Sequence, residues 1–291
     1  MGTVDRRRMC PHCRAFISSD DKICPYCNEK VGARAAEEAA LPIESVVPDQ
    51  STITLLLLLI NAAFFVASIV ISVNQGNGGA IMSLDNRTLI LLGAKWSPEI
   101  LFGGQWWRLI TAGFLHGGIM HILMNGMSLY HVGQHFEDFL GSMRLWIVYI
   151  LGSICGFALS LLVSPYSTSV GASAGLAAMV GALLASSAEP GSPTAPGRRI
   201  YTYWTFGLLV VGFLGNLSGM MRIDNAAHIG GWIAGYLLVK IAGFPASQRS
   251  TKEIFWKGVS ILFVALTLVA FWKMYLFFSA LSQTPAYRMR G

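Results

Sequence analysis

The sequence predicts an all-α polytopic membrane protein with a small cysteine-rich head, and three observations favour this fold class. Hydrophobic residues make up 54% of the 291 residues and charged residues only 12%, whereas soluble domains carry about a quarter charged residues. The apolar residues gather in stretches long enough to cross a bilayer. Four of the five cysteines lie within the first 30 residues. The net charge of +6 suits cytosolic membrane loops, so we expect no nucleic-acid partner.

Seven apolar stretches predict a six-helix core followed by a seventh transmembrane helix. The first stretch, Thr52 to Val73, contains no charged residue and has the length needed to cross roughly 30 Å of hydrocarbon. The second and sixth stretches contain histidines or many glycines, so we expect them to face protein rather than lipid. The other six stretches lie at about 119–136, 143–164, 171–188, 201–218, 225–243 and 255–279.

The predicted domains are a head over 1–34, a linker over 35–51, a six-helix core over 52–245, and a loop with the seventh helix over 246–291. With the N-terminus in the cytosol, cytosolic segments hold 14 of the 21 Lys and Arg residues, as the positive-inside rule requires. We therefore expect a multi-pass protein of a bacterial inner membrane. Residues 74–112 form a long first external loop whose tryptophans suit the membrane interface.

A serine among small residues stands at the predicted start of the fourth helix, in Gly171-Ala172-Ser173-Ala174-Gly175. A helix N-terminus offers unpaired N–H groups to a developing oxyanion. The same small-residue pattern also serves helix packing in membranes, and that interpretation remains open for Ser173 alone.

His228 lies in the sixth stretch, three residues before Gly231. An ionisable ring inside a membrane helix is costly and is a functional candidate. Gly231 and Gly235 have the G-x-x-x-G spacing that lets two helices touch. If these glycines pack on the fourth helix, His228 can take the proton of Ser173. A structural histidine is the alternative, and we expect Asp224 to cap the helix.

The second stretch offers His116, His121 and Asn125. The last two are four residues apart and share one helix face, where their side chains could stabilise an oxyanion. Polar contacts between helices are the alternative. A metalloprotease site is disfavoured because the sequence has no H-E-x-x-H motif. We expect His131 and His135 to reach water at the cytosolic end.

Together these residues resemble the rhomboid family of intramembrane serine proteases in order and in spacing. The resemblance covers roughly residues 52–245 and rests on Trp107-Arg108, His116, His121, Asn125, Gly171 to Ala174, and Ala227-His228 with Gly231.

The resemblance implies cleavage of single-span membrane proteins near the extracytoplasmic surface, without a catalytic cofactor. It implies that Ser173 is the nucleophile and His228 its base, and that His121, Asn125 and the Ser173 N–H form the oxyanion site. Arg108 would help to fold the first loop. Ala177 departs from the aromatic residue common in the family, which leaves open how the His228 ring is held.

A non-catalytic adaptor of the same fold that binds transmembrane segments is the alternative function. The presence of both the serine and the histidine favours the enzyme.

The head contains two C-x-x-C pairs in the spacing C-x2-C-x10-C-x2-C, formed by Cys10, Cys13, Cys24 and Cys27. In a reducing cytosol this spacing predicts a structural zinc ribbon, with redox-active thiols as the alternative. We expect the remaining cysteine, Cys155, to be a buried and inert thiol.

Overall fold

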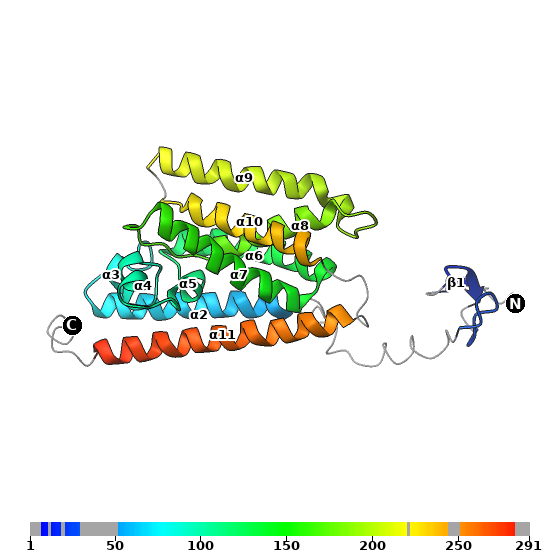
Figure 1. Cartoon of the computed structure of the whole chain (residues 1–291), viewed down its shortest axis with the longest axis horizontal. Coiled ribbons are helices and arrows are strands. Elements are labelled where there is room, and N and C mark those ends of the chain that lie inside the picture. The colour runs from blue at the N-terminus through cyan, green and yellow to red at the C-terminus, as the bar shows by residue number, and fades with distance from the viewer. Residues whose placement is uncertain are drawn as a thin grey trace, which may run out of the picture. The chain divides into compact units, whose positions relative to one another are not determined.

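The computed structural model describes residues 7–10, 13–18, 21–29, 52–219, 222–243 and 251–282. The chain divides into two compact units, Met1–Asp49 and Gln50–Gly291 (Figure 1). The predicted linker over 35–51 lies outside the described residues.

The head unit is a small β-hairpin with two cysteine turns. Strand β1 (Arg7–Met9) pairs antiparallel with β2 (Phe16–Ser18). Each C-x-x-C pair is followed by a residue of positive φ, Arg14 at 61° and Asn28 at 62°. The N–H groups of these two residues donate to the carbonyls of Cys10 and Cys24 respectively, both at 2.9 Å. The head therefore contains the same tight turn twice.

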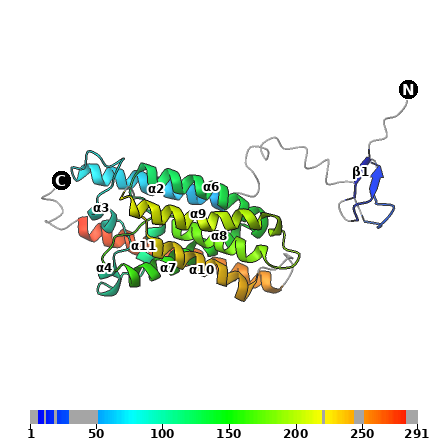
Figure 2. The ribbon, with the colours of Figure 1, turned by 90° about the horizontal axis from the view of Figure 1, so that it is seen from above.

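The second unit is a helical bundle in which every predicted apolar stretch falls on one helix (Figures 1 and 2). This confirms the predicted all-α polytopic fold class. Three short helices in the loop between α2 and α6 were not predicted. The helices of this unit are α2 (Thr52–Asn74), α3 (Asn86–Leu91), α4 (Ser97–Leu101), α5 (Arg108–Thr111), η1 (Ala112–Phe114), α6 (Ile119–Leu140), α7 (Ser142–Val163), α8 (Ser173–Ser187), η2 (Ala195–Gly197), α9 (Arg198–Leu217), α10 (Asn225–Ala242) and α11 (Thr251–Ser282).

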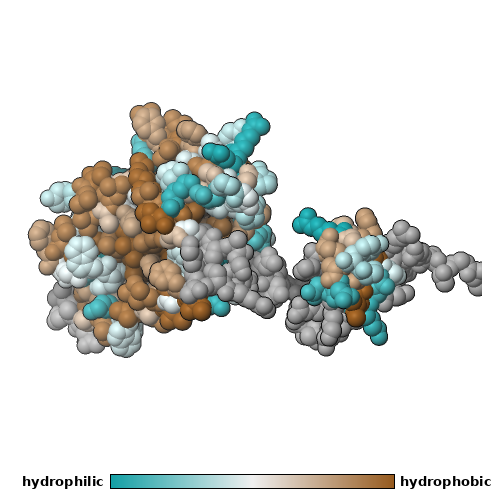
Figure 3. All heavy atoms as spheres, turned by 45° about the vertical axis from the view of Figure 1, so that its right-hand side comes forward, coloured by the Kyte–Doolittle hydropathy of each residue, from teal (hydrophilic) through white to brown (hydrophobic). Residues whose placement is uncertain are grey.

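Among the described residues, 4 helical segments are long and apolar enough to cross a membrane by those criteria alone: α2, α7, η2 with α9, and α11. α8 is shorter, with 15 residues. Polar and glycine residues lower the hydropathy of α6 and α10, which carry the histidines. Figure 3 shows apolar side chains over much of the visible surface of this unit, as expected for a protein in contact with lipid.

Burial separates central helices from peripheral ones. The apolar span in α7 is 61% buried, whereas those in α2, α9 and α11 are 28%, 17% and 22% buried. Nearly every residue of α8 is buried. α7 and α8 therefore form the centre of the bundle together with α10, which packs on both of them. The peripheral helices leave most of their side chains to the lipid.

A carboxylate of α6 caps the first turn of α2. Glu137 is 5% exposed, and its two oxygens accept the N–H groups of Ile53 and Thr54, both at 3.0 Å. The Thr54 hydroxyl also donates to Glu137. Because helix N-termini carry unpaired N–H groups and a partial positive charge, this arrangement satisfies the buried charge and fixes where α2 begins.

Candidate active site

Ser173 is the first residue of α8 and directly follows a tight turn in the preceding loop. Gly171 has a φ of 127°, which side chains rarely adopt, and its N–H donates to the carbonyl of Ala112 at 2.9 Å. Ala172 is the N-cap residue of α8. Ser173 is partly buried, and its N–H belongs to the first helical turn, where N–H groups lack intrahelical partners.

The α8 and α10 helices touch backbone to backbone, as the glycine spacing predicted. A Cβ atom placed on Gly231 would overlap the carbonyl oxygen of Ala174 and lie 3.0 Å from its carbonyl carbon. One placed on Gly235 would overlap the carbonyl oxygen of Ala178. No side chain larger than hydrogen fits at either position. The contact starts one residue after Ser173 and three residues after His228.

A third helix joins this contact. A Cβ atom on Gly156 of α7 would lie 2.8 Å from Cβ of Ala174 and 2.5 Å from the carbonyl oxygen of Ala227. These alanines are the sequence neighbours of Ser173 and His228. The glycines of three helices therefore bring the first turns of α8 and α10 together.

His228 is 8% exposed, and its Nδ1 atom has no hydrogen-bond partner among the described residues. Within the same residues, no hydrogen bond joins His228 to Ser173. Catalytic hydrogen bonds are often long in the absence of substrate. Asp224 caps α10 by accepting the N–H of Ala227 at 3.0 Å, which confirms its predicted capping role.

His121 and Asn125 of α6 point at the loop before Ser173. A Cβ atom on Gly171 would lie 2.7 Å from Nε2 of His121 and 3.2 Å from Nδ2 of Asn125. Nδ1 of His121 accepts the N–H of Gly117 at 3.3 Å, so a neutral ring carries its proton on Nε2. Nδ2 of Asn125 is buried without a partner in the described residues. Two N–H donors therefore converge beside the serine turn.

His116 is fully buried, and in the described part of the chain neither ring nitrogen has a hydrogen-bond partner. Its ring lies edge-on to that of His121, with centroids 5.2 Å apart. It therefore supports the position of His121 by packing. At the other end of α6, His131 is exposed and His135 is partly exposed. His135 Nε2 forms a hydrogen bond with the Tyr201 hydroxyl at 2.7 Å.

Arg108 holds the loop between α2 and α6 together. Its Nη1 donates to the carbonyls of Ile90 at 2.6 Å and Ala94 at 3.1 Å. The guanidinium lies 4.8 Å from the ring centroid of Trp107 and 5.1 Å from that of Phe277. Burial lowers the pKa of Arg108 to about 10, so the side chain stays charged near neutral pH. These contacts tie the loop to itself and to α11.

Lys95 is a positioning residue that sequence reasoning missed. It is fully buried, and its Nζ donates to the carbonyls of Ser164 at 2.7 Å and Ser167 at 3.2 Å. Its backbone forms an antiparallel bridge with Ser169. These contacts hold the segment that leads into Gly171 against the first loop. No local signal marks this role, because a lysine in a polar loop normally lies in water.

Ala177 is fully buried, and no aromatic ring contacts His228 among the described residues. The sequence therefore leaves the face of the His228 ring without the aromatic neighbour expected from the family resemblance. Cys155, expected to be buried, is only partly buried.

The four cysteines of the head form a candidate metal site. Their Sγ atoms all lie within 4.8 Å of one another, with Cys10 to Cys27 at 3.7 Å and Cys13 to Cys24 at 3.6 Å. Disulfide sulfurs would lie about 2.05 Å apart. Four sulfurs placed about 2.3 Å from a tetrahedral zinc ion would lie roughly 3.8 Å from one another. The spacing fits four thiolates around zinc and does not fit disulfides.

The fold and the converging polar groups define a helical membrane protein with a serine and a histidine on neighbouring helices. Comparison with known proteins identifies the family of its central domain. Residues 103–244 match the family model of the rhomboid domain. The chain is 33% identical over 196 residues to rhomboid protease GluP of Bacillus subtilis, across 66% of this chain and 36% of that protein. Residues 103–244 of the chain are therefore a rhomboid domain.

Two relatives from Toxoplasma gondii show similar identity. Rhomboid-like protease 5 is 31% identical over 201 residues, across 69% of this chain and 23% of that protein. Rhomboid-like protease 3 is 33% identical over 156 residues, across 53% of this chain and 58% of that protein. The matched part of this chain thus spans between about a quarter and three fifths of these relatives. They support an intramembrane protease.

Proposed function

We propose that this protein is an intramembrane serine protease that uses Ser173 as its nucleophile and His228 as its general base. The observation that carries the proposal is the backbone contact between α8 and α10, which begins beside both residues. Such a contact fixes the two helices more tightly than side chains could, because neither backbone can give way. Reacting groups need to be held within a fraction of an ångström.

In the proposed reaction, the His228 imidazole accepts the Ser173 hydroxyl proton while the serine oxygen bonds to the scissile carbonyl carbon. The negative charge moves to the carbonyl oxygen, where the Ser173 N–H, His121 Nε2–H and Asn125 Nδ2–H groups stabilise it. Collapse breaks the carbon–nitrogen bond, and His228 gives its proton to the leaving amine. Water then releases the acyl group by the same steps in reverse.

Substrates of the proposed protease are single-span membrane proteins cleaved near the extracytoplasmic surface. The candidate groups lie at the N-terminal ends of α6, α8 and α10, which all lie on the side of the first external loop. The first turn of α2 lies on the opposite side of the bundle, where Glu137 near the end of α6 caps it. With the head in the cytosol of a bacterial cell, the groups would face the outer surface of the inner membrane.

Cleavage of a single-span reporter by purified protein in detergent tests this proposal. We expect Ser173→Ala and His228→Ala each to lower cleavage by roughly 10³-fold or more, because each removes a member of a catalytic unit. Ser187→Ala is the matched serine control, since its hydroxyl donates to Leu184 at the far end of α8. His131→Ala is the matched histidine control, since that ring is exposed.

Both controls should keep wild-type cleavage. Equal cleavage by wild type and Ser173→Ala would refute the mechanism. A wild-type protein that binds the reporter but never cleaves it would instead indicate the adaptor function.

We also propose that the head binds one structural zinc ion through Cys10, Cys13, Cys24 and Cys27. Zinc would cross-link the two turns of a hairpin that is too small to have a large hydrophobic core. Metal analysis of the full chain, purified under reducing conditions, should find about one zinc per chain. Cys10→Ser should lose it and Cys155→Ser should keep it. A wild-type chain without zinc would refute this proposal.

A further inference from the structure

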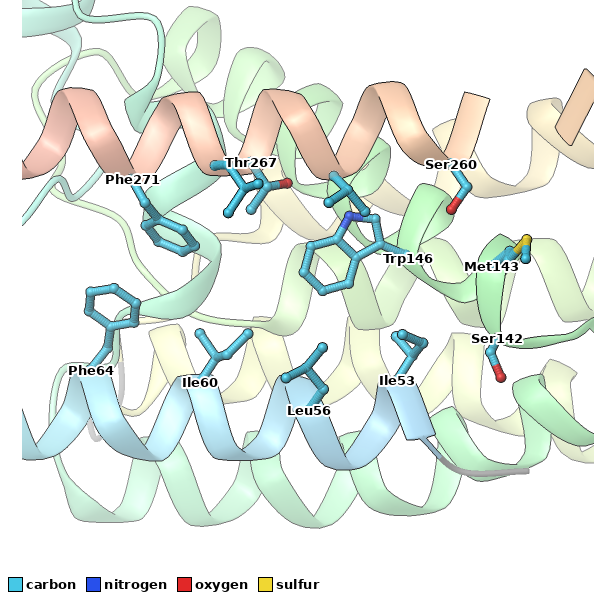
Figure 4. A pocket seen from close by; sticks show the side chains of 12 residues that line it. Ile53, Leu56, Ile60, Phe64, Ser142, Met143, Trp146, Ser260, Thr267 and Phe271 are labelled. Atoms are coloured by element: carbon cyan, nitrogen blue, oxygen red, sulfur yellow. The ribbon is translucent and has the colours of Figure 1, made fainter. Parts of the chain in front are cut away.

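The two ends of α7 meet different surroundings. Its first turns line an apolar pocket together with α2 and α11 (Figure 4). Its last turn is polar, and two charged side chains from elsewhere in the chain bind there. Asp224 binds to Ser160, and Lys95 binds to Ser164. This second end of α7 lies beside the segments that carry the two reacting residues of the proposed mechanism.

Asp224 joins the first turn of α10 to α7. Its Oδ1 accepts the N–H of Ala227 at 3.0 Å, and its Oδ2 accepts the hydroxyl proton of Ser160. Ser160 is fully buried and lies one helical turn after Gly156, which packs against the carbonyl of Ala227. The first turn of α10 is therefore attached to α7 at two adjacent points, and the next residue along α10 is His228.

Lys95 joins the loop before Ser173 to the same turn of α7. Its Nζ donates to the Ser164 carbonyl at 2.7 Å, and the Ser164 N–H donates to the Ser160 carbonyl at 2.8 Å. Its backbone exchanges two hydrogen bonds with Ser169, at 3.0 and 3.1 Å. Ser169 lies four residues before Ser173. The segment that leads to the serine is thus held on the last turn of α7.

The charges of Lys95 and Asp224 are opposite and act on each other. Burial lowers the pKa of the Lys95 ammonium, and the negative charge of Asp224 opposes this change. The same carboxylate interacts electrostatically with His228. A buried charge needs an opposite charge or hydrogen bonds nearby, and Lys95 is fully buried. The two residues therefore compensate each other across the end of α7.

We propose that the last turn of α7 is a common anchor that sets the distance between Ser173 and His228. Lys95 fastens the serine loop to this turn, and Ser160 fastens the start of α10 to it through Asp224. The three are positioning residues, because they act through the two reacting residues and not on the substrate. The inference rests on the proposed function.

Steady-state cleavage of the single-span reporter by the full chain tests the proposal, with kcat and KM measured separately. Ser160→Ala removes only the hydroxyl that reaches Asp224, so α10 loses one of its two attachments to α7. A misplacement of about 1 Å can cost about 100-fold in rate. We expect a smaller displacement here, with kcat about tenfold lower and KM unchanged. Lys95→Met removes the ammonium from the serine loop and should also lower kcat alone.

Ser153→Ala is the matched control. Ser153 is equally buried on the same helix, but its hydroxyl donates to the carbonyl of Tyr149 in that helix at 2.9 Å, so kcat should stay at the wild-type value. A double variant shows whether Ser160 acts through Asp224. Once Asp224→Ala has removed the acceptor, Ser160→Ala should lower kcat less than about twofold further.

All variants are assayed at a temperature at which thermal unfolding shows them folded. Wild-type kcat in Ser160→Ala would overturn the proposal, as would a further tenfold loss in the Asp224→Ala background. A raised KM with unchanged kcat would assign these residues to substrate binding and would also overturn it. Ser173→Ala separates this test from the proposed function. An inactive Ser173→Ala beside a fully active Ser160→Ala refutes only the anchor, whereas an active Ser173→Ala refutes the mechanism itself.

Discussion

Adding one methyl group at Gly231 should disable the candidate active site while leaving the protein folded. In Gly231→Ala, the new Cβ would overlap the carbonyl oxygen of Ala174 and lie 3.0 Å from its carbonyl carbon. Ordinary carbon–carbon contacts lie at about 3.5–4.0 Å. Because both sides of the contact are backbone, α8 and α10 must separate by roughly 1 Å to remove the overlap.

That separation falls between Ser173 and His228. A misplacement of about 1 Å can cost about 100-fold in rate, so we expect cleavage of the reporter to fall by about two orders of magnitude. Overpacking of a core typically costs about 1–3 kcal/mol, so the variant should unfold at a lower temperature but still fold. Initial cleavage rates and thermal unfolding in the same detergent give the two quantities.

Gly207→Ala is the matched control, because a Cβ atom on Gly207 of α9 would meet nothing within 4 Å. Replacing an uncrowded helical glycine by alanine stabilises a helix by about 0.5–1 kcal/mol, and cleavage should not change. Wild-type cleavage by Gly231→Ala would refute the view that this contact sets the distance between the serine and the histidine.

Two further predictions concern carboxylates that cap helices in the helical unit. Glu137→Ala should lower the free energy of unfolding by about 2–4 kcal/mol, because it leaves the Ile53 and Thr54 N–H groups unpaired. Thermal unfolding of this variant, compared with a Leu59→Ala control, measures the loss. An unchanged stability would refute the capping role of Glu137. Partial burial works to raise the pKa of Asp85, but hydrogen bonds from Thr88 and Ser72 outweigh it and lower the pKa below its usual value. A folded-state pKa below the unfolded value means that Asp85 stabilises the fold fully above about pH 4 and progressively less below it. Wild type should therefore lose its stability advantage over Asp85→Asn as the pH falls below 4, and an advantage independent of pH would contradict this reasoning.

Hydropathy predicted where α2, α7, α9 and α11 lie, because the hydrocarbon core imposes length and composition on a segment that faces lipid. The first apolar stretch was predicted to end at Val73, and α2 ends at Asn74. The contact of Gly231 with α8 was also predictable, because a small-residue spacing on a membrane helix has few other uses. These features follow from local pattern.

The anchors of the loops could not be predicted in the same way. Lys95 bonds to carbonyls near Ser164, and Glu137 caps a helix that starts more than 80 residues earlier. Both are charged residues whose role depends on a distant partner, and neither has a local sequence signature. The direction of the His121 and Asn125 side chains toward Gly171 likewise depends on how α6 packs. Only the structure brings these groups together.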